Sequence, residues 1–257
     1  MTDQMEPALI PTVGCTIALM TLLVCWITVC LLDHTNAFYP YMSTFMVFSP
    51  ESHLGYLMGT WYAIFATISQ WIWCDAIRIK LNQRPKSILA NVLLCLLRLL
   101  SLLMGVGEVG LFCISMVENN ELHYNFTAVT FVGLTASLAV DLCLNIRFLR
   151  SGRMFVVTRS ILLLQCIVGI ICFKLFDVLL PMFGEPKSLF HRYPEEKTYT
   201  VDVLCAASEW CLISALIGYT AVQAVHLYQF KLTLPKVYRL EYSQVSPLVK
   251  EPRRCQV

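Results

Sequence analysis

Six long, mostly apolar stretches recur along the chain, and they limit the folds open to it more than any other feature. They cover residues 13–32, 54–73, 88–117, 126–149, 156–176 and 200–227. A helix of about 20 apolar residues spans the hydrocarbon core of a bilayer. Mean hydropathy is +0.65 and only 14% of residues are charged, against about 25% in soluble domains. We therefore predict an all-α polytopic membrane protein: a six-helix transmembrane domain over residues 1–228, and a disordered cytosolic tail over residues 229–257.

Lysine and arginine are spread unevenly between the connections, and this bias predicts the orientation. Fourteen lie in the second and fourth connections, at the start of the fifth span or in the tail, against three in the first, third and fifth connections. Basic residues favour the cytosolic side, so both termini are predicted to face the cytosol. The count places Arg159, at the start of the fifth span, on the cytosolic side. The third span is expected to tilt or bend at its glycine-rich run, residues 105–110.

Four polar residues lie in or beside the spans, on the predicted lumenal side. Glu209 falls about 13 Å below the lumenal start of the last span, and Glu108 lies at a similar depth in the third. Asp202 lies two helical turns before Glu209 on the same face, and His123 comes just before the fourth span. Polar groups at this depth face the bundle interior. One hypothesis is therefore a lumen-facing site that binds a lipid head group, a proton or a cation.

Two other interpretations of these residues stay open. Glu209 in its protonated form can hydrogen-bond a neighbouring helix as a packing contact. Catalysis would require Glu108 to meet His123, which needs a sharp bend in the third span. The chain holds no HExxH, GxSxG or paired CxxC motif, so we predict no enzyme activity, no metal and no cofactor. A net charge of +2 makes nucleic acid an unsuitable partner, and membrane lipids are the expected ones.

Two short motifs lie outside the spans. Tyr242 to Val245 matches the tyrosine-x-x-bulky pattern that clathrin adaptors read on cytosolic tails, in which an extended peptide inserts two side chains into pockets. The alternative is a tail without a partner. Asn125 begins an Asn-Phe-Thr sequon on the predicted lumenal side; the alternative there is a chance tripeptide in a short turn.

The first and last lumenal loops resemble those of the damage-regulated autophagy modulator (DRAM) family. The matching residues are Asn36, Phe38, Pro40, Tyr41, Pro50 and Glu51 in the first loop, His123 before the fourth span, Pro194, Glu196, Lys197 and Tyr199 before the last span, and the Glu209-Trp210 pair within it. The resemblance implies a six-span protein of the lysosomal or late-endosomal membrane that promotes autophagy and is linked to apoptosis.

The end of the third span departs from that family. It reads MVENNELHY, and Glu108 is not a DRAM feature. Glu108 is more similar to the related branch that acts in Golgi lipid remodelling of GPI anchors, which also keeps an acid–aromatic pair in its last span. The alternative implied function is therefore that of a Golgi or ER membrane factor in GPI-anchor remodelling.

The basic bias predicts opposite accessibility for Lys187 and Lys250. In intact vesicles with their cytosolic face outward, a membrane-impermeant maleimide should label Lys250→Cys, and should reach Lys187→Cys only after permeabilisation. The parent chain gives the background from its own cysteines. Equal labelling at both positions in intact vesicles would contradict the orientation.

Overall fold

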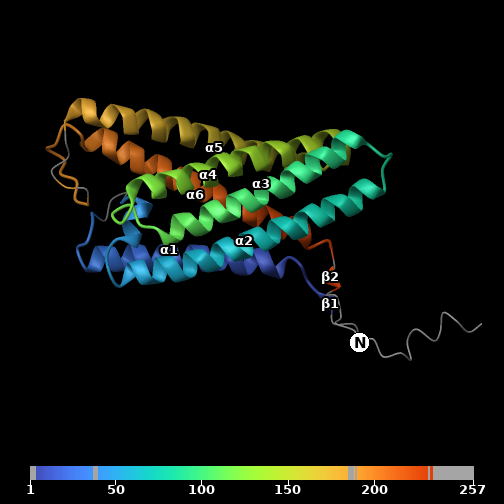
Figure 1. Cartoon of the computed structure of the whole chain (residues 1–257), viewed down its shortest axis with the longest axis horizontal. Coiled ribbons are helices and arrows are strands. Elements are labelled where there is room, and N and C mark those ends of the chain that lie inside the picture. The colour runs from blue at the N-terminus through green and yellow to red at the C-terminus, as the bar shows by residue number, and fades with distance from the viewer. Residues whose placement is uncertain (1–3, 37–39, 185–187, 189, 231, 234–257) are drawn as a thin grey trace, which may run out of the picture.

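The computed structural model is an up-and-down bundle of six long helices (Figure 1). It describes residues 4–36, 40–184, 188, 190–230 and 232–233. The long helices are α1 (Leu9–Leu31), α2 (Glu51–Asn82), α3 (Ile88–Cys113), α4 (Asn120–Leu144), α5 (Arg153–Leu179) and α6 (Tyr199–Leu227). Short helical turns η1 (Met42–Met46), η2 (Asn145–Leu149) and η3 (Leu180–Phe183) flank them, and two-residue strands β1 (Gln4–Met5) and β2 (Leu232–Thr233) pair antiparallel.

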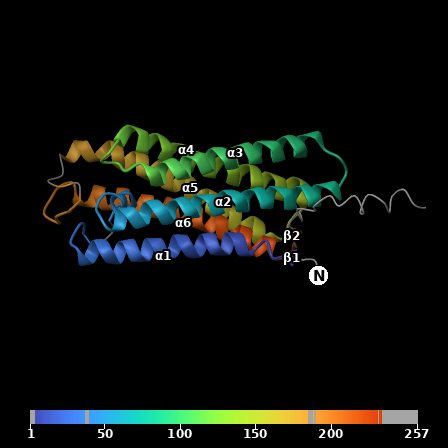
Figure 2. The ribbon, with the colours of Figure 1, turned by 60° about the horizontal axis from the view of Figure 1, so that its bottom comes forward.

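Each helix packs against the next along the chain, and α6 closes the ring by packing against α1. α6 also contacts α2 and α4, so it touches most of the bundle (Figure 2). The β1–β2 pair lies at one end, together with residues 83–87 and 150–152, and we call this the terminal end. The opposite loop end holds residues 32–36, 40–50, 114–119, 184, 188 and 190–198. The basic bias predicts that the terminal end is cytosolic and the loop end lumenal.

Five of the described helices are long and apolar enough to cross a membrane, namely α1, α3, α4 with η2, α5 with η3, and α6. α2 is 32 residues long but does not reach the same hydropathy. Its polar Ser69 and Gln70 are fully buried inside the bundle, whereas Trp61 and Ile68 on its outer face are exposed. The outer surface of α2 around Trp61 and Ile68 is thus apolar like that of its neighbours, whereas Ser69 and Gln70 face the interior of the bundle.

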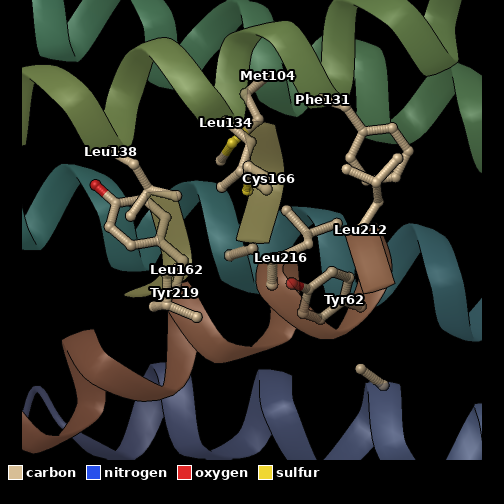
Figure 3. Close-up of a cluster of buried hydrophobic side chains, with 13 residues drawn as sticks. Tyr62, Met104, Phe131, Leu134, Leu138, Leu162, Cys166, Leu212, Leu216 and Tyr219 are labelled. Carbon is tan, nitrogen blue, oxygen red and sulfur yellow. The ribbon is translucent and has the colours of Figure 1, made fainter. Parts of the chain in front are cut away.

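Buried apolar side chains fill the centre of the bundle between α2, α4, α5 and α6 (Figure 3). Leu134 and Leu138 of α4 and Cys166 of α5 have no exposed surface. Leu212 and Tyr219 of α6 close the cluster from the other side. Large apolar residues also cover the outside of the helices, as expected where lipid replaces water.

The glycine-rich run of α3 does not interrupt the helix, which continues from Ile88 to Cys113. The run permits close packing instead. A β-carbon on Gly107 would lie 2.7 Å from Oγ1 of Thr130, and one on Gly110 would lie 2.4 Å from the ring of Phe126, both on α4. Small residues let membrane helices approach in this way, so the run serves a tight α3–α4 contact.

The connection between α3 and α4 is shorter than the hydropathy pattern predicted. Ser115 and Glu118 form a turn in which each accepts a backbone N–H of the other, at 3.0 and 3.2 Å. Asn119 then caps α4 by accepting the Leu122 N–H at 3.0 Å. α4 therefore begins at Asn120, not Phe126, and the sequon residue Asn125 lies exposed in its second turn.

Candidate functional site

Glu209 of α6 binds the backbone of loop one, the connection between α1 and α2. One carboxylate oxygen accepts the Met42 N–H at 2.8 Å and the other accepts the Ser43 N–H at 3.2 Å. Met42 and Ser43 begin η1, and the first N–H groups of a helix have no partner within it. Glu209 thus caps η1 from another helix, and satisfies two donors that would otherwise be buried without a partner.

Asp202, two turns earlier on α6, binds the same loop through side chains. The Tyr41 hydroxyl donates to one Asp202 oxygen at 2.6 Å, and Nε of Arg192 pairs with the other. The Arg192 guanidinium also lies 4.5 Å from the centre of the Tyr41 ring, a cation–π distance. Burial, with Cys205 and Asp202 nearby, raises the pKa of Tyr41 well above its ordinary value, so its hydroxyl stays a donor.

Loop one is also joined directly to loop five, the connection between η3 and α6. The Asn36 amide donates to the Arg192 carbonyl at 2.8 Å and accepts the Arg192 N–H at 2.9 Å. The Trp210 indole donates to the Pro40 carbonyl at 2.8 Å. We call this set the loop junction: Asn36, Pro40, Tyr41, Met42, Ser43, Arg192, Asp202, Glu209 and Trp210. It fixes loop one on α6.

Most other described residues of the DRAM resemblance lie at or just before the starts of α2 and α6. Glu51 opens α2 and pairs with His34 at 2.5 Å, and Pro50 immediately precedes that helix. Glu196 lies in the turn before α6, where its side chain accepts from Thr198 at 3.4 Å. Pro194 and Lys197 are exposed in that turn and Tyr199 begins α6, while Phe38 lies outside the described residues.

An apolar cavity of about 60 Å³ lies below η1, between α1, α2, α3, α4 and α6. Its walls include Thr21, Phe45, Tyr62 and Phe131. Glu209 is the one charged residue among the described residues that line it, and its two oxygens already bind loop one. A space with such walls stays dry and accepts apolar groups. A second cavity of about 80 Å³ lies between α4, α5 and α6, and shares Thr127 and Phe131 with the first.

The structure does not join the four residues of the proposed polar site by hydrogen bonds. Asp202 and Glu209 both bind loop one, although through different groups. His123 lies at the start of α4 and its Nδ1 is 2.6 Å from the Ile114 carbonyl, which braces the α3–α4 connection. Glu108 is fully buried on α3, and neither of its oxygens has a hydrogen-bond partner within the described part of the chain.

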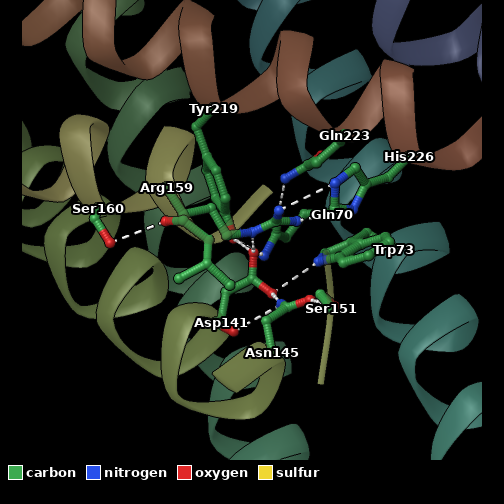
Figure 4. Close-up of polar contacts among 11 residues, drawn as sticks. Gln70, Trp73, Asp141, Asn145, Ser151, Arg159, Ser160, Tyr219, Gln223 and His226 are labelled. Carbon is green, nitrogen blue, oxygen red and sulfur yellow. Dashed lines mark hydrogen bonds and ion pairs between the residues drawn. The ribbon is translucent and has the colours of Figure 1, made fainter. Parts of the chain in front are cut away.

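A larger polar cluster in the terminal half was not predicted from the sequence (Figure 4). Arg159 of α5 is fully buried and its Nε binds Asp141 of α4 at 2.7 Å. The Arg159 guanidinium also lies 3.2 Å from both ring nitrogens of His226, and the Trp73 indole donates to Asp141 at 3.0 Å. Arg159, which the charge count includes among the basic residues of the cytosolic side, is therefore buried and paired inside the bundle rather than exposed at its end. The sequence does contain a sign of this pairing, because Asp141 and Arg159 lie in adjacent spans and charged residues within spans are expected to pair.

Other polar residues complete this cluster. Asn145 donates to Asp141 at 2.8 Å, and the Tyr219 hydroxyl lies 3.4 Å from the second Asp141 oxygen. The Gln70 amide donates to Tyr219 at 2.9 Å, and Gln223 binds Gln70. Asp141 thus has several donors, as a buried carboxylate requires. The adaptor motif at Tyr242 and Val245 lies outside the described residues.

The comparisons with known proteins give one match. A family model described as the Frag1/DRAM/Sfk1/Cwh43P N-terminal domain matches residues 7–230. Neither the curated proteins nor the solved structures contain a match. The matched range runs from just before α1 to just after α6, and so includes the loop junction and the polar cluster.

The capping geometry predicts different outcomes for two substitutions at Glu209. Glu209→Gln keeps the volume and one carbonyl oxygen, so it can still accept one of the two N–H groups of η1. Glu209→Leu leaves both without a partner, at a cost of about 1–3 kcal/mol for each. Thermal unfolding in detergent should therefore give midpoints in the order parent, Glu209→Gln, Glu209→Leu. Glu121→Leu, at an exposed position in the first turn of α4, is the control. A parent-like midpoint for Glu209→Leu would show that the cap contributes nothing.

Proposed function

Because the chain belongs to the Frag1/DRAM/Sfk1/Cwh43P family, we propose that it is a non-enzymatic membrane protein of the lysosome or late endosome that modulates autophagy. In this proposal it acts by holding the end of a lipid acyl chain in the cavity below η1. The observation that carries the proposal is that the residues of the DRAM resemblance build the roof of that cavity. Tyr41 and Trp210 fix loop one, and Glu209 both holds η1 and lines the space beneath it.

The dimensions and chemistry of the cavity support a chain end as the occupant. A volume of about 60 Å³ admits a few methylene groups rather than a whole lipid. The walls are apolar, so an apolar chain end can enter from the bilayer without the cost of burying an unpaired polar group. The adjoining cavity beyond Thr127 and Phe131 extends the same gap between α4 and α6. Side-chain movement at these two positions would join the two spaces.

The cavity proposal predicts that filling the space removes function without unfolding the protein. Thr21 lines the cavity, and its hydroxyl donates only to the Ile17 carbonyl of its own helix. Thr21→Phe should lower the amount of co-purified lipid, measured by mass spectrometry, and reduce autophagic flux toward that of cells lacking the protein. Thr16→Phe is the matched control, because Thr16 makes the same bond to Thr12 on the exposed face of α1.

Both variants should be expressed equally and should be monodisperse in detergent. Parent-like flux and lipid content in Thr21→Phe would overturn the proposal. Loss of flux in both variants would mean that α1 cannot tolerate a ring at either position. In that case Ala18→Leu, at a second lining position on α1, gives the deciding measurement.

One observation favours the alternative of a Golgi or ER factor in GPI-anchor lipid remodelling. Glu108, which departs from the DRAM pattern, is buried with both oxygens free of described partners, and an unsatisfied buried acid is a recognised mark of a functional site. The two functions differ in a simple measurement. Removal of the chain should lower GPI-anchored proteins at the cell surface under the alternative, and should leave them unchanged under the autophagy proposal.

The adaptor motif gives a separate prediction on location. Tyr242→Ala removes the ring that would enter the adaptor pocket, so the steady-state distribution should move from lysosome-like organelles toward the plasma membrane. Tyr238→Ala, in the same tail but without a bulky apolar residue at the third position after it, is the control. An unchanged distribution of Tyr242→Ala, measured by quantitative imaging, would mean that the motif has no role in sorting.

A further inference from the structure

The terminal end of the bundle contains a cavity that the proposed function does not use. Its volume is about 640 Å³, and it lies between the α2–α3 connection, the start of α3 and the segment after α4. Arg84 and Lys86 contribute from the first connection, and Arg147 and Arg150 from the second. Two connections that are some 60 residues apart in sequence thus bring four cations to one hollow.

The positive charge in this cavity is not balanced by the protein. No acidic residue is among the described residues that line it. None of the four cations forms an ion pair with any acid in the described ranges. Arg98 and Arg159, in the same half of the bundle, are both paired, with Asp75 and Asp141. Four like charges around one space repel each other. A bound anion would offset this electrostatic repulsion.

The backbone around the cavity is held in place by buried groups. Arg147 lies in the π-helical turn η2 and Arg150 follows it in the left-handed conformation, with φ of 50°. Asn145, at the start of η2, is bound by Asp141 and Ser151. On the facing side Ser87 caps α3, and the α3 N-terminus points its positive dipole end at the cavity.

Exposed apolar side chains lie beside the residues that line the cavity. Ile88 and Leu89 of α3 and Ile146 of η2 flank it, and all three are exposed apolar side chains. A ligand could therefore place an anionic head in the cavity and its chains in the adjacent hydrocarbon. The basic bias predicts that this end faces the cytosol, where anionic lipids are concentrated.

We propose that this cavity binds the head group of a lipid that carries more than one phosphate, such as a phosphorylated inositol lipid. The volume is far larger than one phosphate needs, and a phosphomonoester carries about −1.5 to −2 charges at neutral pH. Two phosphates would thus roughly balance the four cations. Arginine binds phosphate through paired N–H donors, which assigns specificity chiefly to Arg84, Arg147 and Arg150.

Binding to the purified full-length protein in detergent tests the proposal. The probes are dioctanoyl phosphatidylinositol bisphosphate, dioctanoyl phosphatidylcholine with the same chains, inositol trisphosphate and inorganic phosphate. The bisphosphate lipid should bind, and the choline lipid should not. The double variant Arg147→Gln/Arg150→Gln should weaken binding by about tenfold for each arginine removed, on the order of 100-fold together.

The control is Arg78→Gln/Arg153→Gln, which removes two exposed arginines of the same end that do not line the cavity. Its affinity should stay within about twofold of the parent. Equal losses in the two double variants would overturn the proposal, because binding would then reflect only the general charge of this end. Arg84→Gln/Lys86→Gln, in the other connection, gives an independent second variant if the first has a lowered unfolding midpoint. Inositol trisphosphate or inorganic phosphate binding as tightly as the lipid would overturn the assignment to a lipid.

Discussion

The lack of water inside a bilayer is the constraint on which this structure depends. Every buried donor and acceptor must then find a partner in the protein. The Asp141–Arg159 ion pair shows the consequence most fully, because each member has further hydrogen-bond partners from α2, η2 or α6. Removal of one member alone would leave a buried charge without compensation, which costs about 3–5 kcal/mol. The pair therefore locks α4, α5 and α6 in one relative arrangement.

α6 connects this cluster with the loop junction. Its first turns carry Asp202 and Glu209, which hold loop one, and its last turns carry Tyr219, Gln223 and His226, which enter the Asp141 cluster. An acid can persist at Glu209, within so apolar a helix, because it has hydrogen-bond donors to bind. Its carboxylate supplies the two acceptors that the first turn of η1 needs at that depth. The cavity beneath η1 exists because the loop is held there.

The three hollows differ in the kind of group they suit. Those below η1 and beside Phe131 are small and apolar, whereas the one at the terminal end is large and surrounded by cations. We propose an apolar chain end as the occupant of the former and a phosphorylated head group as the occupant of the latter. The two proposals rest on separate chemistry and can be tested separately.

The sequence by itself determined the helical class, the approximate spans and the likeness of loops one and five to a known family. These follow from local patterns, since apolar runs match the bilayer thickness. A pair close along one helix is also local: Lys174 lies 3.6 Å from Asp177 at i, i+3 spacing. It did not reveal which polar groups meet. Asp202 and Glu209 share a face, yet only the folded loop shows that Tyr41 and two backbone N–H groups bind them. Arg159 entered the sequence argument only as one of the basic residues of the cytosolic side, and Arg84 and Arg147 looked unrelated. Partners such as these are distant along the chain, and the packing of the helices, to which all six contribute, decides which of them come into contact.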